Sequence, residues 1–245
     1  MMETMSIPSE PVDVPARVRM LARGAALVPV WRNDYGGLTF RSDAGEFIKY
    51  GPLNAESSLA DEAVRLGWAA RYTTVPTVRE TGTDGRHEWL VTAALPGLSA
   101  VDPHWRAQPE VAVRAVGEGL RALHDALPVD DCPFDWSVAS RLARAAERGI
   151  VVDATLHEPP TIDRLVVCHA DACCPNTLLG EDGRWLGHVD LGVLGVADRW
   201  ADISVAAMST GWNYGPGWED ALLDAYGIDA DEERMAYYRS LWNAT

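Results

Sequence analysis

The chain has 245 residues, a formal net charge of −15 at pH 7 and a hydrophobic content of 47%, enough to bury a large core. No stretch approaches the roughly 20 apolar residues that span a bilayer, and the N-terminus lacks the order of a signal peptide. The sequence predicts a cytoplasmic protein without membrane contact. Its negative charge argues against a nucleic-acid partner and favours a cationic small molecule.

The first 95 or so residues are predicted to form a small antiparallel sheet with one helix. A flexible arm is expected over residues 1–20. Short apolar segments follow, separated by glycine-containing turns, as is typical of paired strands. Apolar residues at helical spacing predict a helix over 59–72. The expected strands are 27–31, 38–42, 46–50 and 87–95.

The remainder of the chain changes to helical patterns around one predicted hairpin. The segment "NTLLGEDGRWLGHVDLG" has Asp182-Gly183 at its turn and predicts two paired strands. These patterns predict an α+β fold of two lobes, an N-terminal lobe over 21–94 and a helical C-terminal lobe over 95–245. Helices are expected over 109–127, 137–149, 198–212, 217–227 and 231–245.

The hairpin and the strand before it carry a candidate site for phosphoryl transfer. "HAD" places His169 two residues before Asp171, Asn176 follows five residues later, and Asp190 begins "DLG" on the far arm of the hairpin. In phosphoryl transfer one aspartate accepts a hydroxyl proton, while an asparagine and a second aspartate hold Mg²⁺. Hard oxygen ligands suit that ion.

Two residues of the first lobe extend this hypothesis. Lys49 ends the predicted strand "EFIK", and Glu62 lies in the next helix. A strand lysine paired with a helix glutamate positions nucleotide phosphates in the kinase fold. Lys49, Glu62, Asp171, Asn176 and Asp190 therefore occur in the order and on the elements that a kinase-like enzyme requires.

The sequence resembles the aminoglycoside phosphotransferases, especially the members that phosphorylate 3'- and 3''-hydroxyls. The resemblance is carried by "FIKY", "WLVTAALPG", "VVCHADACCPN", "GHVDLGVLGVADRWADISVA" and "YGIDADEERMAYYRSLW", and it covers the chain from about Leu27 onwards. It implies a protein-kinase-like fold with a catalytic hairpin. It also implies transfer of the γ-phosphate of ATP, with GTP as an alternative, to an aminoglycoside hydroxyl, and thus antibiotic resistance. A monomer or weak homodimer is expected.

The resemblance also implies roles for individual residues. Asp171 is expected to be the catalytic base and His169 to brace its loop, while Asn176 and Asp190 would bind Mg²⁺. Asp202 resembles a buried aspartate that fixes the catalytic loop. Residues expected to contact ATP are Lys49 with its partner Glu62 at the phosphates, Gly36 and Gly37 in the phosphate loop, Phe47 stacked on the purine, and backbone groups from Ala93 to Leu95 at the adenine edge.

An aminoglycoside carries several ammonium groups that carboxylates can pair with. The candidates for this role are Asp153, Glu158, Glu219, Asp220, Glu232 and Glu233. The sequence also departs from the family pattern. Ala170 replaces the glycine of "HGD", a change that is tolerated if the backbone there avoids positive φ. Tyr35 and Val193 are also unusual, the segment before "VVCHAD" is short, and the ending "YYRSLWNAT" lacks the usual acidic character.

Residues 168–174 contain three of the four cysteines of the chain. Other interpretations of this stretch fit the sequence less well. A zinc site would use Cys168, His169, Cys173 and Cys174, but the adjacent cysteines have poor ligand spacing. A nucleophilic cysteine would need a feature that lowers its thiol pKa. Among functions, a kinase of another small molecule and a catalytically weak relative that binds a nucleotide or a cationic ligand remain alternatives.

Overall fold

The structure is a computed structural model that describes residues 11–33, 35–54 and 58–245. The chain divides into two compact units. The first contains residues up to Ala70 together with Pro76–Leu95, and the second contains Arg71–Val75 and Pro96–Thr245. The predicted boundary between 94 and 95 lies one residue before this division, and sequence patterns did not indicate that 71–75 belong to the second unit.

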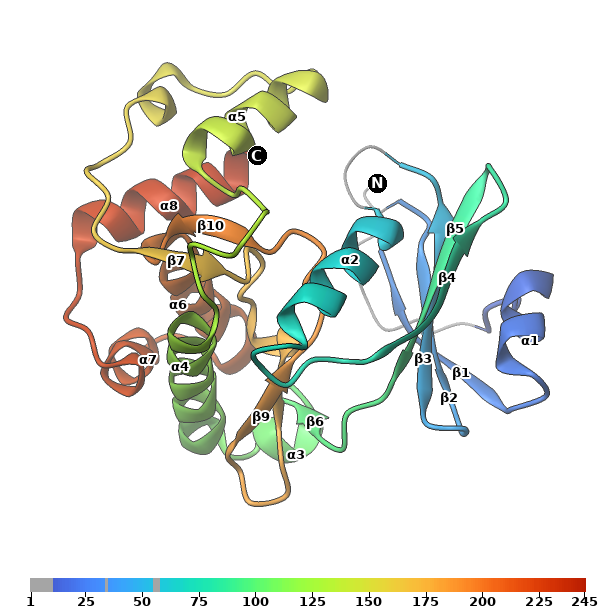
Figure 1. The fold of residues 1–245 in the computed structure, drawn as a ribbon. Coiled ribbons are helices and arrows are strands. Elements are labelled where there is room, and N and C mark those ends of the chain that lie inside the picture. The colour runs from blue at the N-terminus through green and yellow to red at the C-terminus, as the bar shows by residue number, and fades with distance from the viewer. Residues whose placement is uncertain (1–10, 34, 55–57) are drawn as a thin grey trace. The chain divides into compact units, whose positions relative to one another are not determined.

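The first unit is a five-stranded antiparallel sheet with a helix on each face (Figure 1). The strand order is β1-β2-β3-β5-β4, so the central strand β3 pairs with β2 on one side and β5 on the other. Its elements are α1 Ala16–Ala22, β1 Leu27–Arg32, β2 Leu38–Ser42, β3 Glu46–Pro52, α2 Leu59–Ala69, β4 Val78–Thr83 and β5 His87–Ala93.

Successive side chains of β3 point to opposite faces of the sheet, and each face packs against a different helix. Ile48 is buried in a cluster with Phe40 of β2 and Val18 of α1, while its neighbour Lys49 points to the other face. The predicted flexible arm over 1–20 is therefore corrected for residues 16–20. They form the first part of α1, because Val18 and Leu21 gain burial against the sheet. Residues 1–10 of that arm lie outside the described residues.

The second unit combines helices with short strands (Figure 1). Strand β7 pairs with β10, and β8 pairs with β6 and β9. Helix α6 is buried over most of its length, in keeping with its apolar composition. The elements are β6 Leu98–Ser99, α3 Pro103–Arg106, α4 Pro109–Ala126, α5 Val138–Glu147, η1 Ala154–His157, β7 Leu165–Cys168, η2 Cys174–Asn176, β8 Thr177–Leu179, β9 Trp185–His188, β10 Gly195–Asp198, α6 Trp200–Tyr214, α7 Glu219–Tyr226 and α8 Glu232–Ala244.

The short strands are the elements that the sequence patterns missed. Strand β4, Val78–Thr83, was not among the expected strands. This strand, "VRETGT", lies at the sheet edge and contains one large apolar residue, Val78, so it lacks the alternation that reveals a half-buried strand. β6 and β10 are two and four residues long, and each pairs with a strand that is distant in the sequence.

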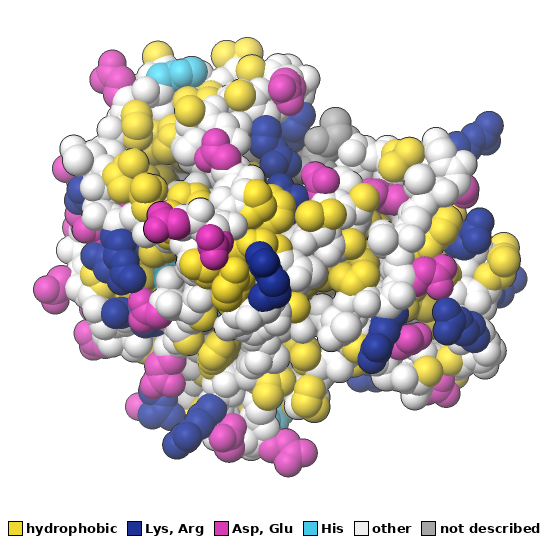
Figure 2. All heavy atoms as spheres, in the orientation of Figure 1, with side chains coloured by type: hydrophobic (Ala, Val, Ile, Leu, Met, Phe, Trp, Pro, Cys, Tyr) yellow, Lys and Arg dark blue, Asp and Glu magenta, His cyan; other side chains and the backbone are white. Residues whose placement is uncertain are grey.

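The surface mixes charges of both signs. On the face drawn in Figure 2, acidic and basic side chains are interspersed with apolar ones. Within the described parts of the chain, no helix has both the length and the apolar character needed to cross a membrane.

Close packing of α4 against α7 leads to a test of this fold. A Cβ atom added at Gly117 of α4 would lie 2.6 Å from the Leu222 carbonyl oxygen and 2.7 Å from the Ala225 Cβ atom, both in α7. We expect Gly117→Ala to lower the free energy of unfolding by about 1–3 kcal/mol, because the two helices must separate. Urea denaturation measures this change.

Gly67 of α2 provides the matched control, since a Cβ atom there would meet nothing within 4 Å. Gly67→Ala should stabilise the protein by about 0.5–1 kcal/mol through helix propensity. Equal effects of the two substitutions would contradict the close α4–α7 contact.

Candidate active site

An ion pair in the first unit joins the sheet to α2. Lys49 Nζ lies 2.7 and 2.8 Å from the two carboxylate oxygens of Glu62. Glu62 is buried and Lys49 is about one-quarter exposed. Ser58 caps the helix by accepting a hydrogen bond from the Asp61 N–H, which fixes the first turn that carries Glu62. The structure thus brings together these two residues as the sequence predicted.

The glycine-containing turn between β1 and β2 is organised by Asn33. Its Oδ1 atom accepts hydrogen bonds from the N–H groups of Tyr35 and Gly37. Gly36 has a φ of 80°, which favours glycine, and a Cβ atom on Gly37 would lie 2.6 Å from the Asn33 side chain. Both glycines are therefore required by the turn itself. Asp34 lies outside the described residues.

The other residues expected at a nucleotide lie on β3 and just after β5. Phe47 is half-buried and, two residues before Lys49, lies on the same face of the sheet. The N–H groups of Ala93 and Ala94 donate to the carbonyls of Thr77 and Gly45. Among the described residues the Leu95 N–H has no acceptor, so Leu95 is the better candidate of the predicted pair for donating to a ligand.

In the second unit, the loop after β7 brings Asp171, Asn176 and His169 together. Asn176 Nδ2 donates to the backbone carbonyl of Asp171 at 2.9 Å and to its carboxylate at 3.0 Å. His169 is fully buried, and its Nδ1 atom accepts from the Asp171 N–H at 3.3 Å. Asp171 itself is only partly buried. The carboxylate is therefore oriented by Asn176, and the backbone that carries it is held by His169, while the side chain stays partly exposed.

The β8–β9 hairpin places Asp190 beside this loop. Thr177 pairs with His188, and the Val189 N–H donates to the Asn176 carbonyl at 3.0 Å. The Val189 carbonyl lies 2.9 Å from His169 Nε2. With both of its backbone groups bound to the loop, Val189 fixes the position of the next residue, Asp190, whose φ is 61°.

Asp202, in the first turn of α6, holds the backbone of the loop. Its carboxylate accepts hydrogen bonds from the N–H groups of His169 at 2.6 Å and Ala170 at 2.8 Å, and it contacts His124 Nε2 at 3.0 Å. Burial opposes ionisation of this fully buried group. The hydrogen bond from His124 and the charges of His124 and His169 nevertheless hold the pKa of Asp202 below its ordinary value.

Ala170 adopts a conformation that the sequence analysis assumed it would avoid. Its φ is 73°, in the left-handed region that disfavours side chains with a Cβ atom. The condition under which the replacement of glycine would be harmless is therefore not met. The two N–H groups bound to Asp202 impose this backbone, because His169 and Ala170 must both point their N–H groups at one carboxylate.

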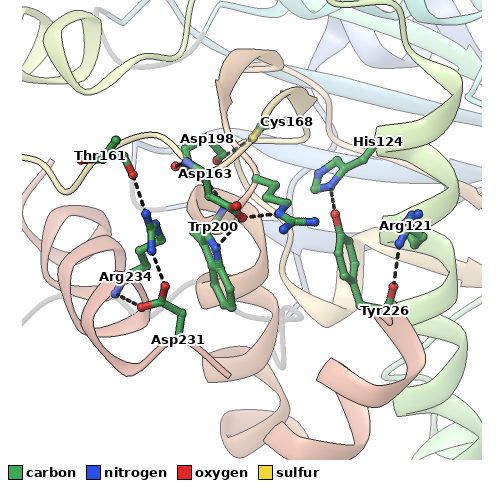
Figure 3. Close-up of polar contacts among 11 residues, drawn as sticks. Arg121, His124, Thr161, Asp163, Cys168, Asp198, Trp200, Tyr226, Asp231 and Arg234 are labelled. Atoms are coloured by element: carbon green, nitrogen blue, oxygen red, sulfur yellow. Dashed lines mark hydrogen bonds and ion pairs between the residues drawn. The ribbon is translucent and has the colours of Figure 1, made fainter. Parts of the chain in front are cut away.

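The segment before β7 is fastened to β10 and α8 (Figure 3). Asp163 accepts from Arg199 Nε at 2.6 Å and from Trp200 Nε1 at 3.0 Å, and its own N–H donates to Asp198. Arg234 Nη2, which comes from α8, donates to the Thr161 carbonyl at 2.8 Å. This short segment is thus held by several polar contacts.

Four of the six predicted substrate carboxylates have local structural roles. Asp153 caps η1 by accepting from the Thr155 N–H, and hydrogen bonds from Thr155 lower its pKa. Glu232 and Glu233 occupy the first turn of α8, where negative charge favours the helix dipole. Glu219 pairs with Arg239 at 2.6 Å. Glu158 follows η1 and is exposed, as is Asp220 in α7.

The cysteines pack inside the second unit. Cys168, Cys173 and Cys174 are buried. Burial raises the pKa of Cys168 well above its ordinary value and that of Cys174 to about 11, while burial and the nearby Asp171 carboxylate raise that of Cys173. At neutral pH these side chains are therefore thiols, which are poor nucleophiles and poor metal ligands.

The possible metal ligands that lie close together are not the set of residues proposed for the zinc site. Among the described residues, the side chains that could surround one ion are His124, Cys168 and Asp202, of which only Cys168 belongs to the alternative. His124 and Asp202 are already hydrogen-bonded to each other and to the loop or Tyr226.

Sequence reasoning missed the support behind Asp202. His124 of α4 lies between Asp202 and Tyr226 of α7, with its Nδ1 atom 2.8 Å from the Tyr226 hydroxyl (Figure 3). Arg121 donates to the Tyr226 carbonyl. The position of His124 on an otherwise apolar helix face was a signal that it is a buried, hydrogen-bonded residue, but its partners are 78 and 102 positions away.

The left-handed backbone at Ala170 leads to a stability test. We expect Ala170→Gly to stabilise the protein by about 1 kcal/mol, which corresponds to a rise in Tm of roughly 2–4 °C, because glycine tolerates positive φ. Ala122→Gly in helix α4 is the control and should destabilise by about 1 kcal/mol. A lower Tm for Ala170→Gly, measured by calorimetry, would contradict the strain.

The hydrogen bonds to Asp202 lead to a second test. Asp202→Asn keeps the side-chain volume but replaces one carboxylate oxygen with an NH₂ group. This group cannot accept the hydrogen bonds that the oxygen accepted and would face N–H donors instead. We expect a loss of about 3 kcal/mol in the free energy of unfolding, measured by urea denaturation. Asp61→Asn, at an aspartate whose side chain is 65% exposed, should change it by less than about 0.5 kcal/mol.

Comparisons with known proteins agree with this geometry. The model of the phosphotransferase enzyme family matches residues 47–238. An aminoglycoside 3'-phosphotransferase from Streptomyces fradiae is 37% identical over 219 residues, covering 78% of this chain and 81% of the relative.

Solved structures give the same result. The crystal structure of an aminoglycoside-3'-phosphotransferase of type VIII has a TM-score of 0.77 and 33% identity, covering 89% of this chain and 93% of that one. A structure of APH(3'')-Id from Streptomyces rimosus in complex with ADP and streptomycin is similar in fold, with a TM-score of 0.70, 23% identity and coverage of 92% and 96%. The predicted kinase-like α+β fold is thereby confirmed, and the chain belongs to the phosphotransferase enzyme family, as an aminoglycoside phosphotransferase.

Proposed function

We propose that this enzyme transfers the γ-phosphate of ATP to the 3'-hydroxyl of an aminoglycoside antibiotic in the cytoplasm, and so confers resistance. The observation that carries the proposal is the loop from His169 to Asn176, in which a partly exposed carboxylate accepts from an asparagine and the backbone N–H of the same aspartate donates to a buried histidine. The relatives with 37% and 33% identity are both named as 3'-phosphotransferases, which favours the 3'-hydroxyl over the 3''-hydroxyl.

Asp171 is proposed to act on the hydroxyl of the acceptor. Its carboxylate accepts the hydroxyl proton as the acceptor oxygen forms a bond to the γ-phosphorus and the bond from that phosphorus to the β,γ-bridging oxygen breaks, which releases ADP. Asn176 holds the carboxylate through Nδ2, and His169 holds the Asp171 backbone by accepting from its N–H. Because His169 is fully buried, it serves as a positioning residue.

Asn176 and Asp190 are proposed to hold Mg²⁺, which would neutralise negative charge on the phosphates. The donor set fits this ion. Both hydrogen bonds from the Asn176 side chain leave through Nδ2, so its amide oxygen is directed elsewhere and can serve as a ligand. Asp190 directly follows Val189, whose N–H donates to the Asn176 carbonyl, and both side chains offer hard oxygen atoms.

The first unit is proposed to bind ATP. The Lys49–Glu62 pair holds an ammonium group in place, and a lysine held in this way binds the α- and β-phosphates in the kinase fold. Phe47 lies on the same sheet face, two residues away. The structure of the Streptomyces rimosus relative with ADP supports adenosine nucleotides as ligands of this fold.

A coupled nucleotide-release assay tests the proposal. Purified protein with ATP and Mg²⁺ is expected to release ADP when kanamycin, neomycin or streptomycin is added. Asp171→Asn should lower kcat by at least about 100-fold, because the proton acceptor is lost. Asp182→Asn, an exposed carboxylate in the turn of the hairpin, is the matched control and should retain wild-type kcat.

Two outcomes would contradict this account. ADP release with an unrelated small alcohol but with none of the three antibiotics would identify a kinase of another substrate. ATP binding without ADP release on a wider panel would identify a catalytically weak relative.

A further inference from the structure

Two tryptophans from different helices of the second unit, one exposed and one half-buried, form an aromatic pair. Trp212 of α6 and Trp242 of α8 have ring centroids 5.5 Å apart with an interplanar angle of 40°. Trp212 is 54% exposed, although nearly all of α6 before it is buried. An exposed indole of this size contributes little to the core, so its position calls for another explanation.

Hydrogen bonds connect this pair to the loop that carries Asp171. Ser209, three residues before Trp212, is fully buried, and its Oγ atom accepts from the Cys174 N–H at 2.9 Å. Asn213, the residue after Trp212, donates to the Ser209 carbonyl and hydroxyl at 2.8 and 3.1 Å. Three helical residues advance about 4.5 Å along the axis. Trp212 therefore lies about one helical turn from the contact between α6 and the loop.

The chemistry of the pair suits a cation. The faces of an indole ring carry partial negative charge, and an ammonium group within about 6 Å of such a ring is attracted to it. One carboxylate on a neighbouring helix, that of Glu219 in α7, is already paired with Arg239 of α8. The net charge of −15 also attracts cations towards the protein.

We propose that the Trp212–Trp242 pair binds an ammonium-bearing sugar or aminocyclitol ring of the acceptor, through cation–π contact and packing of the C–H face of the ring on the indole. This inference rests on the proposed function and names the residues that select its substrate. Trp212 is a specificity-determining residue, and a ring seated on it lies within one acceptor length of the Asp171 loop.

Isothermal titration calorimetry with kanamycin, in the absence of nucleotide, separates this inference from turnover. Trp212→Leu keeps an apolar side chain but removes the aromatic face, so the Kd for kanamycin should rise about 3- to 30-fold. The Kd of Trp212→Phe for kanamycin should lie between the values for the wild type and Trp212→Leu. The Kd for ATP and the Tm should stay at wild-type values in both variants. Met20→Ala, an exposed apolar residue of α1, is the control and should leave kanamycin binding unchanged.

Kinetics and a neutral analogue sharpen the test. Trp212→Leu should raise the KM for kanamycin by a similar factor with kcat nearly unchanged, and per-N-acetylated kanamycin should bind both proteins equally. Equal kanamycin Kd values for the wild type and Trp212→Leu, or no binding to the wild type, would overturn the inference. Kanamycin that binds and responds to Trp212→Leu but is not phosphorylated would overturn the proposed function alone.

Discussion

The second unit depends on one buried carboxylate, that of Asp202. It accepts the N–H groups of two successive residues, His169 and Ala170, and such a group could not be removed from water without these partners. His124 and the Tyr226 hydroxyl extend the contact to α4 and α7. Three helices therefore converge on the two residues before Asp171, and the position of the catalytic base follows from the packing of the core.

That constraint also explains an unusual feature of the loop. Presenting two neighbouring N–H groups to one acceptor forces Ala170 to a φ of 73°, a conformation for which glycine is better suited. The strain is tolerated because the hydrogen bonds to Asp202 over-determine the backbone. Asp190, the other residue with a positive φ near the site, is fixed in a comparable way by the two backbone contacts of Val189.

The parts of the site that the sequence predicted are those whose arrangement follows from the spacing of residues along the chain. Asp171 and Asn176 are five residues apart in one loop, and a hairpin brings Asp190 to the same place, so local order sufficed. Lys49 and Glu62 lie on consecutive elements. These arrangements carry the family resemblance, and most strands and helices follow from apolar periodicity.

Other features depend on contacts that spacing does not encode. The strand β4 has little apolar alternation because it lies at a sheet edge. The φ of Ala170 is imposed by Asp202, 32 positions away. The candidate acids looked available for a cationic substrate, but Asp153 caps η1 and Glu219 pairs with Arg239. The Trp212–Trp242 contact joins α6 and α8, and Trp212 lies outside the stretches that carry the family resemblance.

The central claim is that the Asp171 loop transfers phosphate to an antibiotic hydroxyl. Phosphorus NMR of a reaction containing wild-type protein, ATP, Mg²⁺ and kanamycin tests it most directly, because it identifies the phosphate acceptor. The account predicts one phosphate monoester, coupled to the proton on the 3'-carbon of the sugar, for each ADP formed. Inorganic phosphate in place of the ester would contradict it, because water would then be the acceptor.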